Sequence, residues 1–203
     1  MKITLEMIKD LRTKTGAGIN NVKEALEISQ GDTEKALVYL REKGLAKAVK
    51  RADKRAENGY IYAYIHGEGS LGVMVEMNSE TDFAARSPKF RELAKEIALQ
   101  IAASNPEYIS IENIPADIMQ REKEIAMKDL DPKKPQNIAD KIIEGKLQKF
   151  YEDFVLLEQR YFKDESKTIN DLINDSVAAL GEKIEVGRFC RMKIASNTTS
   201  CNL

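Results

Sequence analysis

The sequence is poor in the side chains that most often build metal centres and nucleophilic active sites. Its 203 residues include one histidine, His66, and two cysteines, Cys190 and Cys201. Zinc sites that use several histidine or cysteine ligands are therefore nearly excluded. A cysteine–histidine nucleophile is also disfavoured, because His66 lies in a turn-like segment far in sequence from both cysteines. We therefore expect no enzyme, no catalytic residues, no metal ligands and no cofactor.

Targeting and membrane signals are missing as well. No apolar run approaches the roughly 20 residues that span a bilayer, so we expect no membrane contact. The N-terminus is an amphipathic helix with acidic residues, unlike a signal or transit peptide. Two cysteines cannot form a disulfide framework, which is typical of a reducing compartment. We expect the protein to act in a bacterial cytoplasm, or in the stroma or matrix of an organelle that encodes it.

What the chain does contain is typical of a globular α+β protein. Apolar residues make up 42% and charged residues 32%, and the net charge of −1 gives no overall attraction to nucleic acid. The patterning divides the chain into a three-helix module at 1–44, a linker helix at 45–58, an α+β domain at 59–194 and a disordered tail at 195–203.

Residues 1–44 have apolar positions at helical spacing in three short stretches. Gly31 ends the second helix, Asp32 is a natural N-cap for the third, and Gly44 ends that helix. A core of this size is marginal, and small three-helix bundles usually serve as docking modules. Taken alone, this module also fits an adaptor protein without other activity.

Residues 45–58 form an alanine-rich basic helix. Lys47, Lys50, Arg51 and Lys54 fall on one face, as in some nucleic-acid readers. The interleaved acidic residues and the lack of a nearby aromatic residue favour a solvated linker helix instead. An RNA-binding protein remains an alternative, but we expect no direct nucleic-acid contact.

From residue 59 the apolar period changes to two. The stretches "YIYAYI" and "LGVMVEM" flank a glycine-containing turn and predict a β-hairpin with three tyrosines on one face. We expect helices to cover that face. Helices are predicted after Pro88, from Pro115, over 137–150 with an interruption near Gly145, and from a cap at Ser166. A last strand at 183–194 can return to the hairpin and complete a small antiparallel sheet.

The segment "NSETDF" (residues 78–83) follows the second strand of the hairpin. Ser87 is predicted to cap the next helix, so Phe83 lies in a polar connection that should face solvent. An exposed phenylalanine adds nothing to the protein's own core. It is either a buried loop anchor or a contact for another protein.

Several motifs together resemble the translation elongation factor Ts family. They are "LRTKTGAGINNVKEAL", "KGLAKAVKRADKRAENGYI", "VEMNSETDFAARSPKF", "IIEGKLQKF", "LLEQRYF" and "SKTINDLI", in this order, and the resemblance covers residues 1 to about 194. It implies a guanine nucleotide exchange factor for elongation factor Tu that promotes GDP release during translation elongation. It also implies a bundle similar to ubiquitin-associated domains.

The resemblance assigns roles to particular residues. Arg12 and Ile19 fall on the positions by which the bundle docks on the GTPase domain of the partner. Asp82 and Phe83, flanked by Thr81 and Ala84, fall on the motif that enters the partner and displaces its magnesium ion. The chain resembles the short form of the family, with one copy of the sheet subdomain, and short forms imply a homodimer. It departs from the family pattern at Asn20, Ser79 and Arg160.

Overall fold

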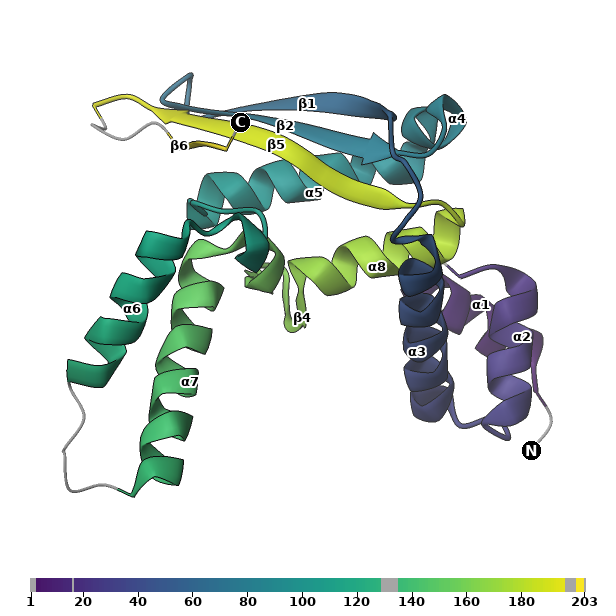
Figure 1. Ribbon diagram of the computed structural model, residues 1–203. Coiled ribbons are helices and arrows are strands. Elements are labelled where there is room, and N and C mark those ends of the chain that lie inside the picture. The colour runs from purple at the N-terminus through teal and green to yellow at the C-terminus, as the bar shows by residue number, and fades with distance from the viewer. Residues whose placement is uncertain (1–2, 16, 129–134, 196–199, 203) are drawn as a thin grey trace. The chain divides into compact units, whose positions relative to one another are not determined.

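The computed structural model describes residues 3–15, 17–128, 135–195 and 200–202 (Figure 1). The α-helices are α1 (Leu5–Thr15), α2 (Ile19–Ile28), α3 (Thr33–Arg51), α4 (Asp82–Arg86), α5 (Pro88–Ser104), α6 (Ala116–Lys128), α7 (Gln136–Phe154) and α8 (Ile169–Leu180). The strands are β1 (Asn58–His66), β2 (Leu71–Ser79), β3 (Arg160–Tyr161), β4 (Asp164–Thr168), β5 (Ile184–Lys193) and β6 (Ser200–Asn202). Short 3-10 helices, η1 and η2, cover Ile111–Asn113 and Leu156–Glu158. The predicted α+β class with an N-terminal helical bundle is confirmed.

The chain forms two compact units, which are described separately. Unit 1 comprises Met1–Tyr62, Glu76–Glu96 and Asp171–Gly187, and unit 2 comprises Ala63–Val75, Ile97–Asn170 and Arg188–Leu203. Strands β1, β2 and β5 contribute residues to both.

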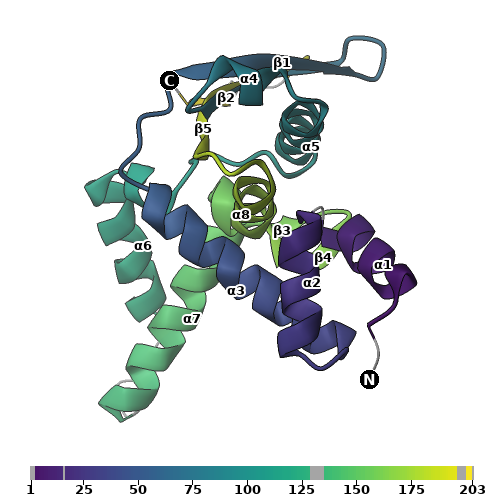
Figure 2. The ribbon, with the colours of Figure 1, turned by 90° about the vertical axis from the view of Figure 1, so that its right-hand side faces the viewer.

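Helices α1, α2 and α3 of unit 1 form a bundle (Figure 2), and this bundle has its own apolar core. Its buried side chains are Ile8, Leu11, Val22, Ala25, Leu26, Ala36 and Leu40. Asp32 caps α3, since its Oδ1 accepts hydrogen bonds from the backbone N–H groups of Glu34 and Lys35, both at 3.1 Å. The three predicted helices and the predicted cap are therefore confirmed.

The predicted end of the third helix at Gly44 is wrong, because α3 continues without a break to Arg51. A Cβ atom at Gly44 would lie 3.1 Å from the Cβ of Ala178 in α8, closer than an ordinary van der Waals contact. Gly44 therefore permits the close approach of another helix rather than stopping its own. The predicted helix at 45–58 is the last part of α3, followed by a turn that leads to β1. Independent folding of residues 1–44 stays a prediction.

Four strands form the main sheet in the order β1-β2-β5-β6, and β3 pairs with β4 in a separate two-stranded sheet. The predicted hairpin is present as β1 and β2, and the predicted last strand, β5, lies next to β2. In unit 1 the guanidinium of Arg91 lies 5.2 Å from the centre of the Tyr60 ring. In unit 2 Tyr64 shares a cavity with Leu99 and Ala102. Helix α5 therefore covers the tyrosine face, as predicted.

Two predictions in unit 2 need correction. Helix α7 runs from Gln136 to Phe154 without an interruption at Gly145, where a Cβ would meet no atom within 4 Å. The helix predicted to follow a cap at Ser166 begins later, at Ile169, because residues 164–168 pair with β3 as strand β4. A polar strand of five residues has no apolar alternation by which the sequence could indicate it.

The tail also differs from expectation. Within the predicted disordered segment, Ser200–Asn202 form β6, which pairs antiparallel with β5; residues 196–199 and 203 lie outside the described residues. Cys190 of β5 is opposite Cys201, and a disulfide joins them. This pairing differs from the free thiols typical of the reducing compartment that the sequence suggested. Backbone pairing and one disulfide hold this short segment, and neither leaves a periodic pattern in the sequence.

Candidate functional site

The candidate site is the segment Thr81–Ala84, called here the TDF segment, in unit 1. Thr81 is the N-cap of the short helix α4, and its Oγ1 accepts a hydrogen bond from the N–H of Ala84 at 3.3 Å. Ser87 Oγ accepts a hydrogen bond from the N–H of Phe90 at 3.2 Å, so the predicted cap of α5 is confirmed. The polar connection expected between strand and helix is thus mostly a single helical turn.

Phe83 points away from the protein. Its side chain is 80% exposed, whereas Ala84 and the following Ala85 are buried. Asp82 forms an exposed ion pair with Arg86, 3.1 Å between carboxylate and guanidinium. The prediction that Phe83 faces solvent is confirmed, and the buried-anchor alternative is wrong. Ala84 lies on the inner side of the turn, and its predicted role beside Asp82 and Phe83 stays a prediction.

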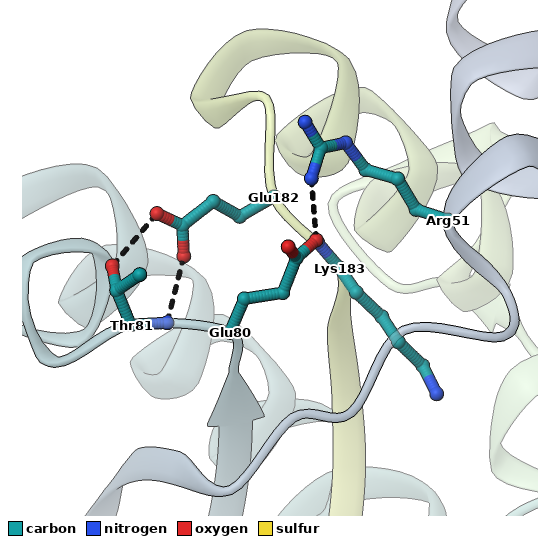
Figure 3. Close-up of polar contacts among 5 residues, drawn as sticks. All are labelled: Arg51, Glu80, Thr81, Glu182 and Lys183. Atoms are coloured by element: carbon teal, nitrogen blue, oxygen red, sulfur yellow. Dashed lines mark hydrogen bonds and ion pairs between the residues drawn. The ribbon is translucent and has the colours of Figure 1, made fainter.

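A bidentate contact fixes the start of α4 (Figure 3). The carboxylate of Glu182 accepts hydrogen bonds from the N–H of Thr81 at 3.0 Å and from its hydroxyl at 2.7 Å. Hydrogen bonds to an ionised acceptor are stronger than those between neutral groups, and two of them to one residue also fix its orientation. Glu182 thereby holds the residue that caps α4.

Glu80, the residue before Thr81, supports the same turn through other partners (Figure 3). Its Oε1 accepts hydrogen bonds from the N–H of Lys183 and from the guanidinium of Arg51, both at 2.6 Å. The N–H of Lys183, aided by the charge of Arg51, lowers the pKa of Glu80 below its ordinary value. Buried Ser79 donates from its hydroxyl to the carbonyl of Thr81 at 2.8 Å. Three consecutive residues, 79 to 81, are thus held by specific polar contacts.

The two predicted docking residues lie on the bundle, apart from the TDF segment in sequence. Arg12 is exposed in the last turn of α1, and Ile19, 47% exposed, is the first residue of α2. Neither contributes to the buried core of the bundle. Both are therefore accessible to another protein.

Comparisons with known proteins decide the family. A sequence model described as "Elongation factor TS" matches residues 5–195. The chain belongs to the elongation factor Ts family. The "Elongation factor Ts" of Coprothermobacter proteolyticus is 54% identical over 192 residues, which are 94% of this chain and 98% of the relative. That of Thermodesulfovibrio yellowstonii is 51% identical over 194 residues, 96% and 97% of the two chains. That of Caldanaerobacter subterraneus subsp. tengcongensis is 50% identical over 192 residues, 94% and 96% of the two chains.

Among the described residues, no group of three or more histidine, cysteine, aspartate or glutamate side chains could hold a metal ion. In the same part of the chain, no helix is both long and apolar enough to cross a membrane. Asp82 forms its ion pair with Arg86. At the TDF segment itself, the exposed side chains of this member of the elongation factor Ts family include Phe83.

Sequence reasoning missed the residues that hold the TDF segment. Glu182 lies 101 residues after Thr81, and Lys183 lies 103 residues after Glu80. No spacing rule connects positions so far apart. The one local signal was the run "SET" itself, in which polar Ser79 ends the buried strand β2 and two further polar residues follow. These groups needed hydrogen-bond partners that the sequence could not identify.

Proposed function

We propose that this chain is a guanine nucleotide exchange factor for elongation factor Tu in translation elongation. The observation that carries the proposal is Phe83, fully presented to solvent on a turn that Glu182 and Glu80 fix. Membership of the elongation factor Ts family supports the choice of partner. The factor acts by binding, without covalent chemistry.

An exchange factor promotes nucleotide release because its own binding to the GTPase and the binding of the nucleotide are thermodynamically linked. A GTPase holds its nucleotide through the phosphate groups and a magnesium ion. A protein that binds the nucleotide-free GTPase better than the loaded one must weaken nucleotide binding by the same factor. In our proposal Phe83 enters the partner as a rigid apolar wedge, and Asp82 rearranges hydrogen bonds near the magnesium ion without becoming its ligand. Loss of the ion then releases GDP, so that GTP can bind.

The wedge alone is too weak to supply the whole coupling. Burying one phenylalanine side chain contributes about 1.5–3 kcal/mol, on the order of a ten- to hundred-fold change in an equilibrium constant. The remaining free energy must come from other surfaces. Arg12 and Ile19 on the bundle are the docking residues in this proposal, consistent with their exposure.

Release of labelled GDP from elongation factor Tu, measured after this protein is added, tests the proposal. We expect a strong acceleration by the wild type, which is reduced by about ten-fold or more in Phe83→Ala and retained in Phe162→Ala. Phe162 is a suitable control because it is also exposed but lies in unit 2. A ubiquitin-associated-like adaptor would bind without regard to the nucleotide state and leave GDP release unchanged, which would contradict the proposal. RNA binding that depends steeply on salt, without any acceleration of GDP release, would also contradict the proposal.

The docking role has its own test. The double variant Arg12→Ala, Ile19→Ala should raise the concentration of factor needed for half-maximal exchange and leave the melting temperature unchanged, because both side chains lie outside the core. A control at exposed Leu5 should behave as wild type. If the double variant promotes GDP release as well as wild type does, these two residues of the bundle do not dock on the partner.

A homodimer belongs to the same proposal. The strands of unit 2 expose Ile65, Met74 and Met192, apolar side chains that a second copy can cover. Sedimentation at micromolar protein concentration measures the oligomeric state. A strict monomer that is still fully active in GDP release would contradict the dimer. The bacterial relatives support action in a bacterial cytoplasm.

A further inference from the structure

A basic cavity lies in unit 1 beside the support of the TDF segment. It has a volume of about 490 Å³ and is lined by Lys47, Lys50, Arg51, Lys54, Glu80 and Gly181. Figure 3 shows two of these residues, Arg51 and Glu80, in contact. Four cationic side chains from α3 and the turn after it thus face one carboxylate. We call this site the basic cavity.

The positive charge exceeds what the protein itself needs there. Arg51 is paired with Glu80, and Lys47 Nζ lies 3.5 Å from the carbonyl oxygen of Ala178 near the end of α8. The C-terminal ends of α3 and α8 each carry roughly half a negative elementary charge. Glu80 and these helix ends balance part of the charge of Arg51 and Lys47, and Lys47 also interacts with the charge of Glu24. Lys50 and Lys54 are exposed, so their charges are available to an anion from outside the protein.

The size and chemistry of the basic cavity select the anion. Pockets for small molecules usually measure about 300–1,000 Å³, and this volume falls in that range. Lysine ammonium groups bind phosphate as point charges, and the arginine fork binds it bidentately. Among the residues that the structure describes, no aromatic side chain lines the cavity, so these residues offer a nucleobase no stacking partner. We propose that the basic cavity binds a small polyphosphate anion through its phosphoryl groups.

An anion bound in the basic cavity would also weaken the polar contacts that support the TDF segment. Arg51 holds Glu80, and Glu80 also accepts the hydrogen bond from the N–H of Lys183. An anion that competes with Glu80 for Arg51 loosens one of the supports that precede Thr81. The binding itself does not depend on the proposed exchange activity, and its test needs no elongation factor Tu.

Calorimetric titration of the full chain with inorganic tripolyphosphate tests the proposal. At about 50 mM salt, where screening of exposed charges is modest, we expect saturable binding of one tripolyphosphate per chain. The variant Lys50→Ala, Lys54→Ala should bind about ten-fold more weakly, since each exposed charge pair contributes modestly. Both lysines are exposed, so this variant should fold. The variant Lys141→Ala, Lys149→Ala removes two exposed lysines of α7 in unit 2 and should bind as wild type.

The location and the ligand class are tested in the same experiment. In amide NMR spectra, tripolyphosphate should shift signals of residues 47–54 together with Lys183 and Thr81. Three results would overturn the proposal: no saturable binding by the wild type, equal weakening in the α7 control, or shifts confined to other residues. A fourth is tight binding of a twelve-residue single-stranded RNA at a site that tripolyphosphate does not occupy, which would identify a nucleic-acid interface instead.

Discussion

The bundle and the TDF segment both expose side chains that we propose contact a partner, but they are built in opposite ways. In the described part of the bundle, an apolar core of seven buried side chains comes from three helices that follow one another in the sequence. The TDF segment is a turn of five helical residues with Ala84 and Ala85 as its buried members. Its position depends on the contacts of Glu182 with Thr81 and of Glu80 with Lys183, and each of these pairs is about a hundred residues apart in sequence.

This difference separates two ways of presenting a contact surface. An apolar core tolerates changes on its outer face, because stability comes from area removed from water. A turn held by charge-assisted hydrogen bonds depends on geometry, because each bond requires one donor and one acceptor in place. Mutations should therefore affect stability most in the bundle and affect function most at the TDF segment.

The largest effect is expected in the bundle core. Leu26 is fully buried, so Leu26→Ala removes packed methyl groups and leaves a cavity. Substitutions of this type cost about 2–5 kcal/mol of unfolding free energy. Urea denaturation monitored by circular dichroism measures the loss. Ile28→Ala, at an exposed position of the same helix, is the matched control and should change stability little.

Phe83→Ala should show the reverse pattern. The side chain is 80% exposed, so the melting temperature should stay nearly unchanged. GDP release from elongation factor Tu should slow by about ten-fold or more, as the area of a buried phenylalanine implies. Asp82→Ala should cause a smaller or comparable loss, and the double variant less than the sum, because both residues act in one displacement. Unfolding of Phe83→Ala with normal exchange by the folded fraction would contradict the wedge.

The sequence predicted the bundle well because its information is local. Apolar positions at helical spacing located three helices, and Asp32 marked the start of α3. The same reasoning failed at Gly44, because a glycine that stops a helix and one that admits a neighbouring helix look alike in sequence. Only the contact with Ala178 distinguishes them.

The TDF segment was predicted in part. Its polar surroundings indicated that Phe83 faces solvent, and the structure agrees. The supports at Glu182 and Lys183 could not be predicted, because tertiary hydrogen bonds between distant residues follow no sequence period. Strand β6 was missed for a similar reason, since backbone pairing and a disulfide hold it.

A smaller effect is expected when the support of α4 is weakened. In Glu182→Gln one carboxylate oxygen becomes an amide NH₂ group, which cannot accept from Thr81. Loss of one such bond at a half-buried site should cost about 1 kcal/mol, or roughly 2–4 °C in melting temperature. The rate of GDP release from elongation factor Tu should fall less in Glu182→Gln than in Phe83→Ala. Glu185→Gln breaks only a partly exposed pair with Lys183 and is the control, expected within about 0.5 kcal/mol of wild type. Equal stability of both variants would mean that the bidentate contact does not fix the turn.

The smallest effect concerns pH and Glu80. The N–H of Lys183, with help from Arg51, lowers the pKa of Glu80 in the folded protein. A carboxyl group whose folded pKa is depressed adds stability above its unfolded pKa of about 4.3, and that stability is lost as the pH falls through the folded pKa. In Glu80→Gln the neutral amide can still accept from Lys183 but gives up the charge that pairs with Arg51. The variant should therefore be less stable than wild type at neutral pH. The difference in unfolding free energy between the two proteins, called here the stability gap, should narrow as the solution is acidified.

Urea denaturation of wild type and Glu80→Gln from pH 7 down to pH 3 measures that gap. Other carboxylates with lowered pKa values, such as Asp32 and Asp164, are present in both proteins, so their contributions cancel in the difference. A gap that stays constant over the whole range would show that Glu80 supports the turn through its shape and neutral hydrogen bonding alone. A gap that closes on acidification would show that ionised Glu80 stabilises the turn before the TDF segment, the kind of polar support that distinguishes this site from the apolar bundle.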